Sequence, residues 1–123
     1  MQRKTLVIAN SDPEQSVLLA GGLREHVEKV LTAASSDELR NAVKKHRPAI
    51  VIADLETVSL NYVAQLRREL ETVHVVCTHR VPDEQMWSAC LGAGASDCCA
   101  SSDVEDIIRA ALCRPYRMRA QAA

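Results

Sequence analysis

Five short apolar runs, each followed by a segment with helical spacing, constrain the fold of this chain of 123 residues more than any other feature. The first, third and fourth runs are nearly continuous and rich in β-branched residues, which is typical of strands buried on both faces of a parallel sheet. The second run contains Glu28 and Lys29 and fits an edge strand, while the fifth is assigned as a strand from its place in the repeat. The runs occupy residues 6–9, 27–31, 49–53, 73–77 and 95–99.

The alternation of strands and helices predicts one α/β domain with a parallel sheet and helices on both faces. Right-handed crossovers and the short chain favour a single doubly wound, five-stranded sheet with the flavodoxin-like strand order 2-1-3-4-5. In such a sheet the functional crevice lies beyond the carboxyl ends of the strands. The polar residues expected at that edge are Asn10, Ser11, Asp12, Asp54, Thr78 and Ser101.

Capping residues mark the starts of several helices. Asp12 precedes a proline and predicts the start of the first helix, since a carboxylate accepts from the free amides there. Ser35 with Glu38, and Ser102 with Glu105, have the spacing of a capping box. We therefore expect the second and last helices to begin after Ser35 and Ser102.

Composition excludes several classes of function. Hydrophobic residues make up 47% of the chain and charged residues 25%, as in globular domains. The net charge of −1 argues against a general nucleic-acid binder, and no apolar stretch is long enough to span a membrane. The amino terminus lacks the pattern of an export signal, so we expect a cytoplasmic protein. We divide the chain into a domain at 1–113 and a basic tail at 114–123.

The five cysteines are expected to be free thiols. Their number is odd, no C-x-x-C motif occurs, and nothing indicates export to an oxidising compartment. Cys98 and Cys99 are adjacent on a predicted strand and should point to opposite faces, so they are poorly placed to chelate one metal ion. We interpret the cysteines as core residues and expect no metal site. A thiol-based redox sensor at Cys98 or Cys99 is a less favoured alternative.

Three features follow one another along the chain: AIVIADL at 49–55, Thr78, and GASD at 94–97. Together they resemble the receiver domain of two-component response regulators, over residues 5–112. The sequence AIVIADL at 49–55 resembles the strand that ends in the family's phospho-acceptor aspartate, here Asp54. GASD at 94–97 resembles the family's turn into the last strand, and Thr78 matches its switch hydroxyl. The resemblance implies phosphoryl transfer from a histidine kinase to Asp54, with Mg²⁺, a lysine and the hydroxyl stabilising the phosphoryl group.

Several positions depart from that pattern. The family's two metal-binding acids match Asn10 and Ser11, its lysine matches Ser101, and its aromatic switch residue matches Cys98. Glu56, in the loop after Asp54, is expected to be solvated; alternatively, its negative charge disfavours an acyl phosphate. Every departure affects the chemistry and none affects the fold. The phosphorylation pocket is therefore predicted to be degenerate.

We accordingly predict an atypical receiver, or pseudo-receiver, of a response regulator. It is not an enzyme, needs no cofactor, and signals by protein–protein interaction, with a histidine kinase, an output protein or a second copy as partner. The expected surface is residues 83–114, with Trp87 as its candidate anchor. The alternative is a working phospho-acceptor in a phosphorelay, with Mg²⁺ held by Asp12 and Asp54. Against it, Asp12 is interpreted as a helix cap.

Overall fold

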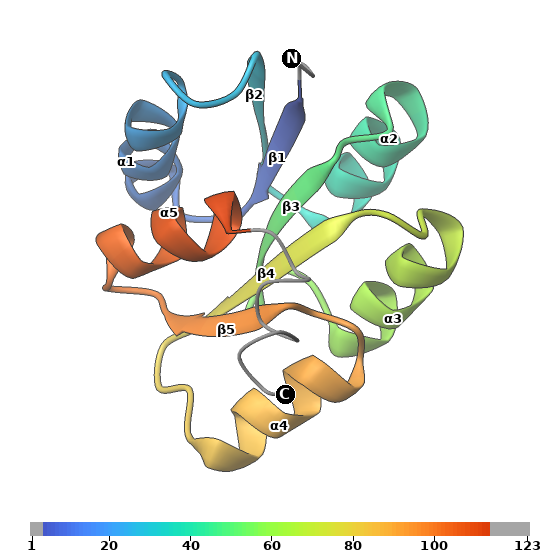
Figure 1. The fold of residues 1–123 in the computed structure, drawn as a ribbon, viewed down its shortest axis with the longest axis vertical. Helices are drawn as coiled ribbons and strands as arrows, with labels where there is room; N and C mark the ends of the chain where they lie inside the picture. Colours follow the sequence, from blue (N-terminus) through green and yellow to red (C-terminus); the bar gives the residue numbers. More distant parts are fainter. Residues whose placement is uncertain (1–3, 114–123) are drawn as a thin grey trace.

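The computed structural model describes residues 4–113, and these form one five-stranded parallel sheet of order β2-β1-β3-β4-β5 (Figure 1). The strands are β1 (Thr5–Ala9), β2 (Lys29–Ala33), β3 (Ile50–Asp54), β4 (His74–His79) and β5 (Asp97–Ala100). The helices are α1 (Pro13–Leu23), α2 (Ser36–His46), α3 (Leu60–Glu69), α4 (Glu84–Gly92) and α5 (Val104–Leu112). The predicted fold class and strand order are confirmed.

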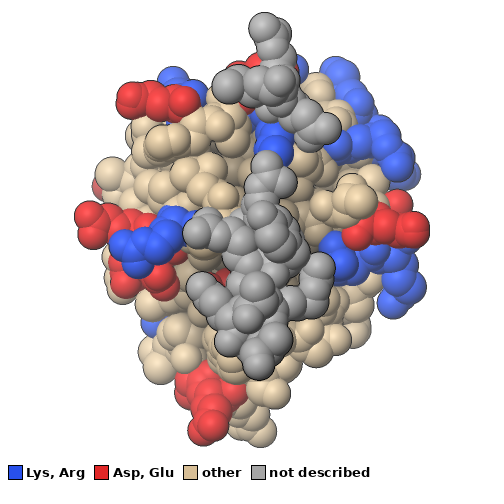
Figure 2. Space-filling model, in the orientation of Figure 1, with Lys and Arg blue, Asp and Glu red and all other residues tan. Residues whose placement is uncertain are grey.

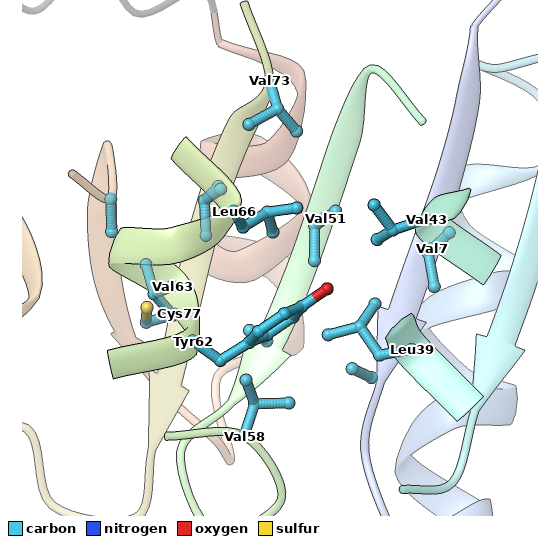
Figure 3. Packing of buried hydrophobic residues seen from close by; sticks show 14 of the residues in the cluster. Val7, Leu39, Val43, Val51, Val58, Tyr62, Val63, Leu66, Val73 and Cys77 are labelled. Carbon is cyan, nitrogen blue, oxygen red and sulfur yellow. The ribbon is translucent and has the colours of Figure 1, made fainter. Parts of the chain in front are cut away.

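Helices cover both faces of the sheet. The buried residues of α1 and α5 pack on one face, and those of α2, α3 and α4 pack on the other. Successive strand residues alternate between the two layers, so that Leu6 and Ile8 join the first core while Val7 and Ala9 join the second. Figure 3 shows the second core, where Tyr62 and Leu66 of α3 face the sheet beside the residues of α2.

Two strands, β2 and β5, begin two residues later than the sequence predicts. β2 starts at Lys29 rather than at residue 27, because the backbone amides of Glu28 and Lys29 both donate to the Lys4 carbonyl and pair Lys29 with Thr5. β5 runs from Asp97 to Ala100 rather than over 95–99. Ala95 is buried, but its amide donates to the Cys90 carbonyl and belongs to the turn after α4.

The helix caps agree with the sequence in two of three cases. Asp12 caps α1 and Ser35 caps α2, each accepting from a free amide of the first turn. The predicted cap at Ser102 is wrong, because Ser102 lies in a turn and the carboxylate of Asp103 accepts from the amide of Asp106. A charged carboxylate gains more than a hydroxyl from the positive end of the helix dipole.

The surface carries charges of both signs. Acidic and basic side chains both occur around the outline in Figure 2, and neither covers that face. Within residues 4–113, no helix is long and apolar enough to cross a membrane. The predicted basic tail at 114–123 lies outside the described residues.

Candidate functional site

A small open pocket lies beyond the carboxyl ends of β1, β3, β4 and β5, at the edge where parallel α/β sheets place their functional crevice. Its volume is about 150 Å³. The structure thus brings together most of the site residues that the sequence predicts. The pocket is lined by Asn10, Ser11, Asp12, Gln15, Asp54, Glu56, Arg80 and Ser101.

Asp54 ends β3 and is 7% exposed, and its carboxylate is held by two neighbours. The hydroxyl of Thr78 donates to Oδ1 at 2.8 Å, and the backbone amide of Glu56 donates to Oδ2 at 3.3 Å. Thr78 faces Asp54 because the two residues are register partners on adjacent strands. Both carboxylate oxygens therefore have a partner within the protein.

Two side chains that follow β1, those of Asn10 and Asp12, line the pocket but accept from backbone amides of the turn into α1. Oδ1 of the buried Asn10 accepts from the Asp12 amide at 2.9 Å. The carboxylate of Asp12 accepts from the Glu14 amide at 3.0 Å, as a helix cap does. The amide of Ser11 donates to Oγ1 of Thr57, which ties this loop to the loop after β3. These bonds fix the turn into α1.

The opposite wall of the pocket is neutral. Ser101 stands where the family's lysine is expected, and its amide donates to the His79 carbonyl at 2.9 Å. The side-chain amide of Gln15 donates to the Ser101 carbonyl, which joins α1 to the loop after β5. A serine at this position supplies no positive charge to an anion beside Asp54.

The positive group of the pocket is Arg80, which the sequence analysis missed. It lies two residues after Thr78 and pairs with Glu56, with 3.2 Å between the guanidinium and carboxylate atoms. Both side chains are largely exposed, so the pair adds at most about 1 kcal/mol to stability. Its position just after the carboxyl end of β4 was the available signal.

The pocket side chains do not fit a magnesium ion. Mg²⁺ prefers several carboxylate or carbonyl oxygens in octahedral array, and the oxygens of Asn10, Asp12 and Asp54 accept the hydrogen bonds described above. Asp54 is also the only buried carboxylate among residues 4–113. In that part of the chain, no group of three or more histidine, cysteine or acidic side chains is arranged to hold a metal ion.

The other two predicted site residues lie away from the pocket. Cys98 points into the core beneath α4 instead of toward Asp54. Trp87 lies on α4 with 43% of its surface exposed, and its indole donates to Oδ1 of Asp97 at 3.3 Å. The alternation predicted for the vicinal pair is confirmed, since Cys99 belongs to the core of the opposite face.

Comparison with solved structures identifies the fold as that of response-regulator receiver domains. A Burkholderia pseudomallei response regulator, solved with a phosphorylated aspartic acid and a calcium ion, matches with a TM-score of 0.79 and 19% identity, over 98% of this chain and 73% of that one. The receiver domain of the putative response regulator NarL from Mycobacterium tuberculosis matches with a TM-score of 0.77 and 16% identity, over 91% and 95% of the chains.

The receiver domain of the Francisella response regulator 1452 matches with a TM-score of 0.78 and 12% identity, over 95% of this chain and 99% of that one. No family model matches the sequence, and no curated protein sequence does. The likeness to receiver domains is therefore one of fold, and the sequence identity to each of these structures is low.

Proposed function

We propose that this chain is a pseudo-receiver, a domain with the receiver fold that signals by protein–protein interaction without phosphorylation of Asp54. The observation that carries the proposal is the state of Asp54, which is buried, bound to Thr78 and Glu56, and surrounded by neutral residues where the family has its acids and lysine. A cytoplasmic location and the absence of enzymatic activity belong to the same proposal.

The charges around Asp54 argue against an acyl phosphate. A phosphoryl group brings up to about two negative charges, and the pocket already contains the carboxylates of Asp12, Asp54 and Glu56. Among residues 4–113, Arg80 is the one cation that lines the pocket, and it is paired with Glu56. Removing one preorganised group that stabilises a transition state typically costs about 3 kcal/mol. The family's two acids and its lysine are all replaced here.

The surface formed by α4, β5 and α5 supports an interaction role. Trp87 is 43% exposed on α4, and Leu112 at the end of α5 and Val81 before α4 are also exposed. Tryptophan is enriched among the residues that dominate the binding energy of interfaces. The partner we expect is a protein: a histidine kinase, an output protein or a second copy of this chain.

A magnesium titration tests the proposal. Calorimetry and the fluorescence of Trp87 should show no saturable response to Mg²⁺ through the millimolar range, and Asp54→Asn should give the same flat curves. The triple variant Asn10→Asp, Ser11→Asp, Ser101→Lys restores the family's charges and should bind Mg²⁺. A saturable response of the natural chain that Asp54→Asn abolishes would overturn the proposal.

Arg80 favours a second candidate function, phosphorylation of Asp54. A guanidinium matches phosphate oxygens in pairs and lies in the same pocket, so it is a substitute for the missing lysine if it leaves Glu56. This candidate requires phosphate uptake that is lost in Arg80→Gln as well as in Asp54→Ala. The pseudo-receiver requires no uptake by the natural chain.

A further inference from the structure

Three cysteines pack together in the core between α4 and the strands β4 and β5. Cys77 of β4 and Cys98 of β5 are register partners on adjacent strands and point to the same face. Cys90 of α4 packs into the same core from above. Cys99 lies on the opposite face, and Cys113 is partly exposed at the end of the described chain. All five thiols are free.

Cys90 is the residue that anchors α4. It is the one buried residue of this helix, and α4 packs mainly against β5. Cys77 and Cys98 belong to the same core cluster as Cys90, and interaction with their thiols lowers the pKa of Cys90. A helix with one buried residue, and Met86 partly buried beside it, opens locally at low free-energy cost, which admits small reactants to Cys90.

The electrostatics of the cluster make Cys90 its most reactive thiol. Hydrogen bonding from Cys77 and then from Cys98 lowers the pKa of Cys90, and the nearby His79 lowers it further. Burial raises the pKa of Cys98, and hydrogen bonding to Cys90 and burial raise that of Cys77. Since the thiolate is the nucleophile, oxidation should begin at Cys90.

We propose that Cys90 and Cys98 form a reversible disulfide that fixes α4 to β5. Hydrogen peroxide is the oxidant: the Cys90 thiolate attacks one peroxide oxygen, the O–O bond breaks, and the sulfur becomes a sulfenic acid (S–OH). The departing hydroxide takes up one proton and leaves as water. The Cys98 thiol then attacks this sulfur, its proton leaves with the hydroxyl as a second water, and the S–S bond forms. Two thiols have lost two electrons to one peroxide, and a dithiol reductant reverses the change.

Cys98 is the better resolving thiol of the two neighbours of Cys90. Cys98 is 7% exposed whereas Cys77 is fully buried. A smaller local opening of α4 is therefore enough for Cys98 to react with the sulfenic acid of Cys90. Cys98 also lies on β5, the strand on which α4 packs, at the end of a short loop from α4. A bond between Cys90 and Cys77 would leave α4 attached to the interior strand instead.

The regulatory meaning of this bond rests on the proposed function, but the bond itself does not. α4 and β5 belong to the proposed interaction surface, and Trp87 lies one turn before Cys90 on the same helix. Fixing α4 would select one arrangement of that surface, and so change the affinity for a partner that prefers it. The thiol state would then take the regulatory place of the phosphoryl group.

Peptide mapping after peroxide treatment tests the bond. The double variant Cys99→Ser, Cys113→Ser removes the vicinal and the partly exposed thiols while leaving the cluster. Cleavage after arginine and lysine puts Cys90 and Cys98 on one peptide, 81–109, and Cys77 on another, 69–80. The expected product is peptide 81–109 lacking two hydrogen atoms, unlinked to 69–80, and restored by a dithiol. Amide exchange in α4 should slow at least about tenfold.

Each other outcome overturns the proposal. Thiols that stay reduced in the folded protein would show that the cluster is inert packing, and a link between 69–80 and 81–109 would assign the bond to Cys77. In Cys98→Ser the product should disappear, whereas Cys77→Ser should keep it. Because the mapping needs no variant of Cys90, a Cys90→Ser protein that fails to fold does not affect the test. Partner binding is measured separately, so failure of the disulfide and failure of the pseudo-receiver are distinguishable.

Discussion

Thr78 donates its hydroxyl proton to Oδ1 of Asp54 across 2.8 Å, and this bond joins the carboxyl ends of two adjacent strands. Both residues are buried, so the bond is sheltered from water. The hydroxyl that would contact a phosphoryl group in a working receiver instead contacts the carboxylate. The two residues that match the family's acceptor and switch hydroxyl are therefore bonded to each other.

Thr78→Val should lower the free energy of unfolding by about 1–3 kcal/mol, because it keeps the shape of the side chain but leaves a buried carboxylate oxygen without its donor. Urea unfolding measures the loss. Thr57→Val is the matched control, since its hydroxyl lies in the half-exposed loop beside Ser11 and should matter less. Equal losses in the two variants would contradict a special role for the Thr78 bond.

Stability should fall as the pH is lowered below about 6.5, the ordinary pKa of histidine. Nε2 of the buried His74 donates to the Ala110 carbonyl at 2.7 Å, and Nδ1 accepts from the Ser96 hydroxyl at 2.8 Å. Burial lowers the pKa of His74, so the folded protein keeps this imidazole neutral while the unfolded chain takes up a proton. The stabilisation is complete above the ordinary pKa and is lost as the pH falls toward the folded pKa.

The check for His74 is the slope of stability against pH. Urea midpoints between about pH 7.5 and pH 5 should fall less steeply in His74→Gln than in the natural chain, because glutamine does not titrate. His26→Gln removes an exposed histidine and should leave the slope unchanged. A slope that His74→Gln does not alter would contradict the assignment.

Replacement by alanine should have opposite effects on stability at two glycines. Gly94 has a φ of 105°, and a Cβ there would meet Cγ of Arg67 at 2.5 Å, so Gly94→Ala should destabilise the domain by about 1–3 kcal/mol. Gly21 lies inside α1 with open space around it, so Gly21→Ala should stabilise by about 0.5–1 kcal/mol. Thermal unfolding of both variants measures the difference, and a harmless Gly94→Ala would mean that the turn before β5 adapts freely.

Trp87→Ala should weaken partner binding or self-association much more than Asp54→Asn does. Truncating an interface tryptophan often costs about 2 kcal/mol, roughly a thirtyfold loss of affinity. Asp54 lies in the pocket, away from this surface, and its replacement should have little effect. Sedimentation measures self-association, and pull-down with a candidate histidine kinase measures partner binding, after circular dichroism has confirmed that both variants fold. The reverse order of effects would mean that the pocket controls the surface.

The sequence could predict the fold because its signals are local. Continuous apolar runs specify β1, β3 and β4, and capping residues such as Asp12 and Ser35 specify helix starts. The predicted bounds of the edge strands were less accurate. For β2, backbone pairing with Lys4 rather than hydrophobicity determines where the strand begins. The choice between Ser102 and Asp103 as the cap of α5 likewise depends on a turn geometry that the spacing does not reveal.

The site could be predicted only in part, because it depends on pairing between distant segments. The family resemblance located Asp54 and Thr78, but not the bond between them. Arg80 directly follows β4, but that position alone does not show that its side chain lines the pocket. The cysteine cluster required the register of β4 against β5, which places Cys77 beside Cys98, and the position of α4 over both.

The most direct test of the pseudo-receiver is the mass of the intact protein after incubation with acetyl phosphate and Mg²⁺. We expect no phosphate-sized gain in mass for the natural chain, because the charges that would stabilise the transfer are missing around Asp54. The variant Asn10→Asp, Ser11→Asp, Ser101→Lys should gain that mass under the same conditions, which shows that the assay detects a restored pocket. A gain by the natural chain that disappears in Asp54→Ala would contradict the account and establish a working phospho-acceptor.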